Sequence, residues 1–405
     1  MSFDPMAVRG EFPILSRTVN ERPLIYLDNA ASAQKPRAVI EAVSAVMQAS
    51  YANVHRGLHT LANEATDAYE AARDSARRLI NAGSASEIVF TKGATEAINL
   101  VASSFGADWG DGDEVVVTEM EHHANIVPWH FLRERQGVTL RFAPILDDGR
   151  LDLEALYDLI GPRTRMVAVS HMSNVLGTIN PVREIVAAAH AAGAATLIDG
   201  CQAIVHGVVD VVDLDTDFYV FSGHKLYGPT GIGVLYGKAE RLASMRPYQG
   251  GGEMIDTVTK EAITYADPPY RFEAGTPPII EAIGLGAAID WLDGLDRPAI
   301  ARHEMALYAR VRERINGANW LTEIGHAPGK GAIFAFNMEG AHAHDVAQVL
   351  DRYGIAVRAG THCAEPLLRR FGVGASARAS FALYNTLDEA DSFVEALEKT
   401  RTLFA

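Results

Sequence analysis

The sequence has few of the features that mark membrane, secreted or nucleic-acid-binding proteins. Its 36 lysines and arginines are outnumbered by 51 aspartates and glutamates, which gives a formal net charge of −15. This charge disfavours nucleic acid and anionic membrane as partners, because both attract basic surfaces. No apolar run approaches the ~20 residues that a membrane-spanning helix needs. The first residues, MSFDPMAVRGEF, lack the basic and apolar regions of a secretory signal. We therefore expect a soluble, cytoplasmic protein that binds neither membrane nor nucleic acid.

Cysteine is scarce, and the common nucleotide-binding motifs are missing. Cys201 and Cys363 are the only cysteines, too few for a disulfide framework and typical of a reducing compartment. The chain contains no GxxxxGK[ST] run, and the glycines at 231 and 233 continue as a strand instead of opening a helix. These absences argue against a disulfide scaffold, a P-loop and a dinucleotide-binding fold.

The sequence does contain a long alternation of strands and helices. At 405 residues, 48% of them hydrophobic and 21% charged, the chain is long enough for two domains with packed cores. Apolar runs predict strands at 87–91, 114–119, 139–145, 165–171, 195–199, 217–222 and 231–236. Helical periodicity predicts helices at 94–105, 124–136, 152–160 and 182–191. This order is typical of an α/β fold with a largely parallel, doubly wound sheet.

A smaller α+β unit follows towards the C-terminus. Its predicted strands are 332–337, 355–358 and 378–383, and its predicted helices are 344–353 and 387–400. Elsewhere the pattern predicts helices at 36–49, within 62–81, at 279–293 and at 299–316, a short strand at 24–28, and loops at 250–253 and 271–278. We place a large domain at 22–285 and a small domain at 1–21 and 286–405.

Polar clusters follow five of the predicted strands, at the edge where doubly wound sheets bind ligands. The clusters are Lys92–Glu96, Glu121–Asn125, His171–Asn174, Asp199–Gln202 and Ser222–Lys225. Together they hold an acid, imidazoles, hydroxyls and a lysine, the groups that pyridoxal phosphate requires. Around the ring, we expect Asp199 to contact the pyridinium nitrogen, His122 to lie on the ring face and Gln202 to contact the phenolic oxygen. Lys225 is expected to be the Schiff-base lysine. The phosphate is expected to bind the helix start at Ala94 together with Thr95, Ser222 and His224.

Two of these residues have a structural alternative when taken alone. Lys225 fits a surface turn as well as it fits a lysine activated by partial desolvation. Thr95 would also serve as an ordinary helix N-cap. The joint placement of all five clusters favours the cofactor.

A second candidate centre lies in the C-terminal unit. Cys363 sits in the loop RAGTHCAEP beside Arg358 and His362, and a neighbouring cation favours the nucleophilic thiolate. The alternative is a small hydrophobic residue beneath the loop. Cys201, which follows a buried strand, is expected to be a packing residue. Arg378, in a predicted strand of small residues, could pair with a substrate carboxylate or form an interdomain salt bridge.

Several motifs together carry a family resemblance. They are EHHAN at 121–125, SNVLG at 173–177, DGCQ at 199–202, SGHK at 222–225, FEAGTP at 272–277, RAGTHCAEP at 358–366 and RASFALYNT at 378–386. The chain resembles the cysteine desulfurases, in particular the SufS-type group of the class-V aminotransferase family, which is related to the selenocysteine lyases. The resemblance spans nearly the whole chain.

The resemblance implies a fold-type I, pyridoxal-phosphate-dependent homodimer that converts L-cysteine to L-alanine. Lys225 would bind the cofactor, and Cys363 would carry the sulfur as a persulfide to an acceptor protein of iron–sulfur cluster assembly. Thr276 would reach the phosphate in the partner subunit's site. Asn174, Arg358 and Arg378 would hold the substrate, with His55 nearby. No metal site is expected, although the histidines at 55 and 59 have the spacing of a metal pair.

The resemblance leaves some points open. Relatives usually lack a thiol at the position of Cys201, and Thr361 replaces a histidine that is common before the final His-Cys pair. A selenocysteine lyase, which releases selenium and L-alanine, is the alternative enzyme. The alternative that is not an enzyme is a subunit of a sulfur-transfer assembly, which would bind the cofactor mainly for its structure. His344 resembles an acceptor-binding position but is also an ordinary helix-start histidine.

Overall fold

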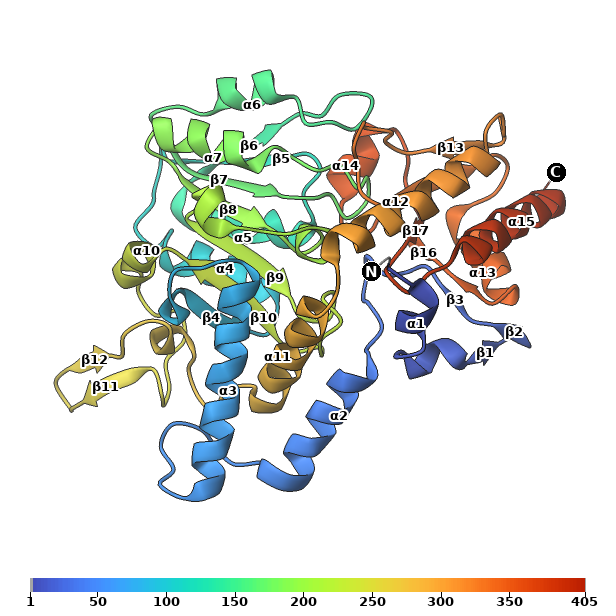
Figure 1. Cartoon of the computed structure of the whole chain (residues 1–405). Coiled ribbons are helices and arrows are strands. Elements are labelled where there is room, and N and C mark those ends of the chain that lie inside the picture. Colours follow the sequence, from blue (N-terminus) through green and yellow to red (C-terminus); the bar gives the residue numbers. More distant parts are fainter. Residues whose placement is uncertain (1–2, 405) are drawn as a thin grey trace.

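The computed structural model describes residues 3–404, and a seven-stranded sheet forms the centre of its larger part (Figure 1). In order across the sheet, the strands are β4 (Ile88–Thr91), β10 (Gly233–Gly237), β9 (Phe218–Ser222), β8 (Ala195–Asp199), β7 (Thr164–Ser170), β5 (Glu114–Thr118) and β6 (Thr139–Ala143). The sequence predicts all seven to within two residues at each end. Residues 1, 2 and 405, which were assigned to the small domain, lie outside the described residues.

The sheet is parallel except at one strand. The pairs β5–β6, β5–β7, β7–β8 and β8–β9 are parallel, whereas β10 runs antiparallel to both β9 and β4. The link from β9 to β10, residues 223–232, contains no helix and is too short for the crossover that a parallel pair needs. It therefore turns back at the carboxyl edge of the sheet, and it carries His224 and Lys225 there.

The two faces of the sheet bury alternate residues of each strand, as the two-residue period of a strand requires. Val89 and Leu197 belong to one core cluster, and Phe90 and Ile198 belong to the other. The helices of the first cluster are α4 (Ala94–Ser104), α5 (Val127–Gln136) and α10 (Ala239–Ser244). The helices of the second include α3 (Thr60–Leu79), α6 (Leu153–Leu159), α7 (Val182–Ala191) and α11 (Ile279–Asp293). The predicted doubly wound α/β architecture is confirmed.

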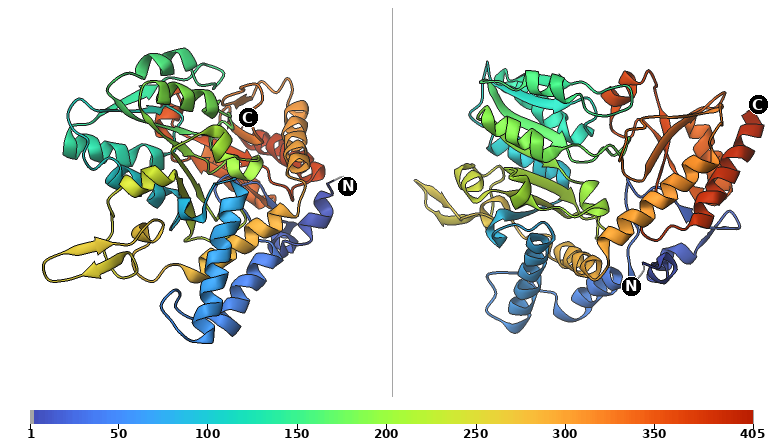
Figure 2. Two further views of the ribbon diagram at one scale, coloured as in Figure 1. Left: turned by 60° about the vertical axis from the view of Figure 1, so that its left-hand side comes forward. Right: turned by 45° about the horizontal axis from the view of Figure 1, so that its top comes forward.

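The C-terminal unit lies beside this sheet, and α11 and the next helix lead from one to the other (Figure 2). Its antiparallel sheet has the order β13 (Leu321–Glu323), β14 (Ile333–Met338), β17 (Ser376–Ser380) and β16 (Arg358–Gly360). Its helices are α12 (Arg297–Arg314), α13 (Ala343–Arg352), α14 (Glu365–Arg370) and α15 (Leu387–Phe404). The N-terminal segment joins this unit, because β3 (Ile25–Tyr26) pairs in parallel with β15 (Ile355–Ala356).

The remaining elements are short. They are α1 (Pro5–Arg9), the hairpin of β1 (Thr18–Val19) and β2 (Arg22–Pro23), α2 (Arg37–Ala45), α8 (Ala203–His206), α9 (Val211–Leu214), and the hairpin of β11 (Ile255–Val258) and β12 (Ile263–Tyr265). No helix within residues 3–404 is long and apolar enough to cross a membrane.

Two elements are missed and one predicted strand is displaced. The hairpin β11–β12 lies between the predicted loops 250–253 and 271–278, where the sequence predicts no element. Its residues are nearly all exposed, so they show no buried face to reveal a strand. The strand β13, also missed, is only three residues long and has no fully buried residue. The strand predicted at 378–383 occupies 376–380, because the chain turns after Ser380 and the Ala382 N–H bonds the Asn385 side chain. The domain boundary at 285 stays a prediction, since Leu285 and Ile289 of α11 share one core cluster.

Candidate active site

A cavity of about 160 Å³ lies at the carboxyl edge of the large sheet, where the C-terminal unit meets it. Eleven of the fourteen predicted site residues line it: Ala94, Thr95, His122, Asn174, Asp199, Ser222, His224, Lys225, Arg358, Cys363 and Arg378. Gln202 lies just behind the wall, because its Nε2 donates a hydrogen bond of 2.8 Å to the carbonyl of the lining residue Ala30. Both candidate centres of the sequence therefore share one cavity.

One wall is the start of α4. The Ala94 N–H donates a hydrogen bond of 2.9 Å to Ser222 Oγ, which ties the helix start to the end of β9. Gly93 caps the helix with a φ of +156°, and a Cβ on Gly233 of β10 would stand 2.4 Å from the Gly93 Cα. Only glycine allows this close approach. Because Gly93 is the N-cap, the alternative role of Thr95 as N-cap is wrong.

The ends of β8 and β5 supply the acid and the imidazole. Asp199 is buried at the end of β8, where its Oδ1 accepts a hydrogen bond of 3.0 Å from the Cys201 N–H. His122 Nδ1 accepts a hydrogen bond of 3.1 Å from the Ala124 N–H, so the proton of the neutral ring lies on Nε2. Burial, helped by the charge of Lys225, lowers the pKa of His122 to about 4. The ring is therefore uncharged at neutral pH.

His224 is uncharged for similar reasons. Burial and the neighbouring Lys225 and Lys35 lower its pKa to about 4. Lys225 itself is half-buried in the connection after β9 and lines the cavity. It thus shares the cavity with two neutral imidazoles and the buried Asp199 carboxyl.

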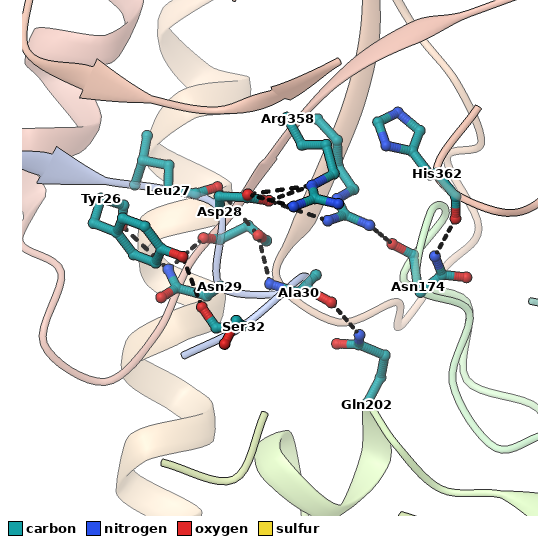
Figure 3. Close-up of polar contacts among 12 residues, drawn as sticks. Tyr26, Leu27, Asp28, Asn29, Ala30, Ser32, Asn174, Gln202, Arg358 and His362 are labelled. Atoms are coloured by element: carbon teal, nitrogen blue, oxygen red, sulfur yellow. Dashed lines mark hydrogen bonds and ion pairs between the residues drawn. The ribbon is translucent and has the colours of Figure 1, made fainter. Parts of the chain in front are cut away.

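Two arginines, Arg358 and Arg378, pair across β16 and β17 and line the cavity. Figure 3 shows Arg358 beside Asp28. Arg378 of β17 is buried, and its Nη1 donates a hydrogen bond of 2.7 Å to the Asn174 carbonyl. Its Nη2 and the Arg358 side chain both contact the carboxylate of Asp28, at 3.3 and 3.2 Å. Arg378 Nε has no hydrogen-bond partner within residues 3–404. Arg378 therefore lines the cavity, forms a salt bridge, and keeps one buried donor without a partner among these residues.

Asp28 is a site residue that the sequence reasoning missed. It holds both arginines, and its segment is anchored because the Ser380 N–H donates a hydrogen bond of 2.7 Å to the Leu27 carbonyl. A signal was present, since Asp28 ends the predicted strand 24–28. The site was predicted only from residues that follow strands of the central sheet, and the strand at 24–28 does not belong to that sheet.

The cysteine loop of the small domain is clamped by residues of the large domain. Cys363 is exposed, so the alternative of a buried hydrophobic residue is wrong. The His123 N–H donates a hydrogen bond of 2.7 Å to the Cys363 carbonyl, and the Asn174 amide donates one of 2.9 Å to the His362 carbonyl. His362 and Cys363 have φ values of +52° and +54°, a conformation that non-glycine residues rarely adopt. These clamps hold the thiol in that strained turn at the cavity.

The electrostatics of the loop differ from the prediction. Burial and the charge of Arg378 lower the pKa of His362 to about 3, and its Nε2 faces Ser376. His362 is therefore neutral, and the cations of the cavity wall are Arg358 and Arg378. His123, which the sequence reasoning also missed, accepts a hydrogen bond of 3.1 Å from the Glu365 N–H through Nε2 and so lies under the loop.

Cys201 contrasts with Cys363. It is buried, and burial together with the charge of Asp199 raises the pKa of its thiol to about 12. A thiol of this kind is not a nucleophile at neutral pH. Cys201 packs in a core cluster, as predicted, and it also lines the wall of the cavity.

Two predicted site residues lie away from this cavity. His55 Nε2 contacts Glu70 Oε1 at 2.9 Å, and Thr276 is exposed beside a smaller cavity that Glu273 and Lys92 also line. His59 is the N-cap of α3, where its ring accepts the Ala62 N–H. Within residues 3–404 no group of three metal-ligating side chains comes together.

Comparisons with known proteins match the whole chain. The family profile described as "Aminotransferase class-V" matches residues 25–393. A cysteine desulfurase from Serratia proteamaculans is 53% identical over 405 residues, which cover 100% of both proteins. The crystal structure of the cysteine desulfurase CsdA (S-sulfonic acid) from Escherichia coli is 40% identical, with a TM-score of 0.93 and 100% coverage of both chains. The apo cysteine desulfurase from Thermococcus onnurineus NA1 is 37% identical, with a TM-score of 0.94 over 99% of this chain and 100% of that one. The expected fold type and the resemblance to cysteine desulfurases are confirmed.

Proposed function

We propose that this chain, which belongs to the class-V aminotransferase family, is a cysteine desulfurase that moves sulfur from L-cysteine to Cys363. The observation that carries the proposal is the meeting of an exposed, clamped cysteine with Lys225 and Asp199 in one cavity. A lysine and an acid alone would serve many reactions of amino acids, whereas a thiol aimed at the same space accepts sulfur. The curated relatives named above favour this activity over selenocysteine lyase.

Pyridoxal phosphate is the cofactor of this enzyme, and the residues of the cavity fit it. The helix start at Ala94, with Thr95, Ser222 and His224, offers N–H and hydroxyl groups to a phosphate. Asp199 is the buried acid that a pyridinium nitrogen requires, and His122 is the flat neutral group for the ring face. Lys225 would hold the cofactor, and Gln202 would reach its phenolic oxygen. When bound, the cofactor supplies an electron sink for the Cα of the substrate.

The remaining residues handle the substrate. Arg378, through its free Nε, and Arg358 bind the carboxylate of L-cysteine, with Asn174 beside them. Lys225 Nζ removes the Cα proton. Cys363 Sγ, as a thiolate, then attacks the substrate sulfur, so that an S–S bond forms as the Cβ–S bond breaks. Cβ keeps the electron pair of the broken bond and takes up a proton, and Lys225 returns a proton to Cα. The products are L-alanine and a persulfide on Cys363.

We also propose that the enzyme is a homodimer that passes its persulfide to an acceptor protein of iron–sulfur cluster assembly. Large apolar side chains stand exposed on the surface around α2 and the hairpin β11–β12, including Met47, Tyr51, Leu58 and Val258. Leu58 is 99% exposed. A second copy would cover these side chains. Cys363 is exposed, and we propose that it remains open to an acceptor.

Alanine release from L-cysteine by the purified holoenzyme tests the function. Lys225→Ala should remove both activity and the visible absorbance of the bound cofactor. Cys363→Ser should keep the absorbance but form no persulfide, as measured by mass spectrometry of the intact chain. Cys201→Ser is the matched control and should leave both readouts unchanged. Full desulfuration of L-cysteine by Cys363→Ser would contradict the proposal.

A further inference from the structure

One short segment, residues 28–35, contacts both groups that the proposed function places around the substrate's Cα. Its first residue, Asp28, contacts Arg358 and Arg378 at 3.2 and 3.3 Å, and these are the two side chains proposed to hold the substrate carboxylate. Ala30, two positions later, lines the cavity (Figure 3). The segment therefore begins at the arginines and continues along the cavity.

The other end of the 28–35 segment holds the peptide bond between His224 and Lys225. The His224 carbonyl accepts hydrogen bonds from Lys35 Nζ at 2.9 Å and from the Ala33 N–H at 3.1 Å. Ser32 Oγ donates a third hydrogen bond, of 3.3 Å, to the same carbonyl. The N–H of this peptide, which belongs to Lys225, reaches its own acceptor only at 3.4 Å. The 28–35 segment therefore supplies the shorter hydrogen bonds on the peptide that leads into Lys225.

Lys35 is a partly buried lysine that the proposed function does not use. Its Nζ also donates a hydrogen bond of 2.6 Å to the Ala33 carbonyl, so the ammonium joins two backbone carbonyls. Burial lowers the pKa of Lys35 to about 8, so the charge costs folding stability at neutral pH. An apolar side chain of the same length would avoid this cost, but it would leave the His224 carbonyl with fewer donors.

We infer that Lys35 is a positioning residue: by joining the 28–35 segment to the His224 carbonyl, it fixes the backbone of Lys225 relative to the arginines. The inference deepens the proposed function and rests on it. The Cα of L-cysteine carries both the carboxylate that the arginines hold and the proton that Lys225 removes. Lys225 Nζ and the arginines must therefore be placed precisely around one carbon atom. A displaced Lys225 backbone would leave the substrate bound but its Cα proton out of reach.

Exchange of the Cα proton of L-alanine in D₂O tests this role directly. Because Lys225 returns a proton to the Cα of the product, the holoenzyme should also remove that proton from added L-alanine. Proton NMR follows the loss of the Cα signal, and the assay involves neither Cys363 nor sulfur. The variant is Lys35→Met, which keeps the length of the side chain and removes its charge and its donors.

We expect Lys35→Met to lower the maximal exchange rate per bound cofactor by about tenfold or more, since displacing a reacting group by ~1 Å has effects of this size or larger. The L-alanine concentration at half-maximal rate should change by less than about twofold, because the carboxylate contacts are unaltered. Alanine release from L-cysteine should likewise lose kcat and keep its KM. An unchanged rate, a rise in the half-maximal concentration alone, or a fall explained by lost cofactor would overturn the inference.

Lys330→Met is the matched control. Lys330 is also a buried lysine whose Nζ donates a hydrogen bond of 3.0 Å to a carbonyl, that of Gly325, but it does not line the catalytic cavity. Its substitution should leave the exchange rate per bound cofactor unchanged. An equal fall in the Lys330 and Lys35 variants would overturn the inference, because it would show an effect of any buried ammonium.

A milder variant and a second readout complete the test. If Lys35→Met does not fold, Ser32→Ala removes the third donor to the His224 carbonyl and should slow the exchange in the same direction, whereas an unchanged rate would overturn the inference. If the unchanged enzyme releases alanine from L-cysteine without exchanging L-alanine, the kcat of alanine release decides by the same factor. Absence of alanine release from the unchanged enzyme would instead contradict the proposed function.

Discussion

The substitution Arg378→Lys tests how the cavity recognises the carboxylate of its substrate. Two edges of the guanidinium are already used, by the Asn174 carbonyl at 2.7 Å and by Asp28 at 3.3 Å, and Nε remains for a ligand. A lysine keeps the charge, but its three donors radiate from one nitrogen, which cannot reach the Asn174 carbonyl, Asp28 and a ligand at three separate places as the guanidinium does. The variant therefore loses one charge-assisted hydrogen bond to the substrate, worth about 1.5–3 kcal/mol.

This free energy corresponds to a fall in kcat/KM of about 10- to 150-fold, since 1.4 kcal/mol is a factor of ten. The fall should come mainly from KM, because the carboxylate contact is equally strong before and during the reaction. Steady-state alanine release over a range of L-cysteine concentrations measures both constants. The bound cofactor's absorbance should be unchanged, because Arg378 belongs to the small-domain sheet and is not one of the residues proposed to hold the cofactor.

A ligand without a carboxylate provides the control. L-Alanine and ethylamine share an amine, and only the first can use Arg378, so binding is compared through the change each causes in the cofactor's absorbance. Arg378→Lys should weaken L-alanine and leave ethylamine as it was. Equal weakening of both ligands, or a loss in kcat with KM unchanged, would refute the carboxylate assignment.

Two further predictions concern thiols and pH. Iodoacetamide at neutral pH should label Cys363 and spare Cys201, because burial raises the pKa of the Cys201 thiol to about 12. Peptide mass spectrometry identifies the labelled cysteine. Labelling of Cys201 in the native protein would contradict its description as a buried, unreactive thiol. Burial lowers the pKa of His171 to about 4, so the folded state holds it neutral while the unfolded chain protonates near 6.5. Stability should therefore be complete above pH 6.5 and fall as the pH drops towards 4, by about 1–2 kcal/mol at pH 5 from this group. Urea titrations at pH 7.5 and 5 should show a smaller loss in His171→Gln, whereas an equal loss would exclude His171 as a cause.

Much of the site could be predicted because most of its residues follow strands of the central sheet. Parallel strands deliver their carboxyl ends to one edge, so His122, Asn174, Asp199 and Lys225 come together although 103 positions separate the first from the last (225 − 122). Hydrophobic runs mark those strands because both faces are buried. Cys363 could be predicted as a nucleophile because cationic residues lie near it in the sequence. In the structure His362 is neutral, and the cations at the cavity are Arg358 and Arg378.

The missed residues depend on contacts that no local pattern encodes. Asp28 reaches the site only because β3 pairs with β15, and His123 only because the cysteine loop folds over it. The hairpin β11–β12 has no buried face, so its strands leave no period in the sequence. The roles of His55 and Thr276 remain predictions, since neither residue lines the cavity of its own chain.

The position of Asp28 also sets when the active site can form during synthesis. Its partner Arg378 lies 350 residues later in the chain. At the ribosome's pace of 5–20 residues per second, that interval lasts roughly 20–70 s. Through all that time the first segment has neither β15 to pair with nor arginines to hold. The large sheet can assemble in the meantime, but the carboxylate pocket is closed last, by the first and the final parts of the chain together. A ribosome stalled shortly before residue 355 would therefore carry a nearly complete cofactor site that cannot hold a substrate.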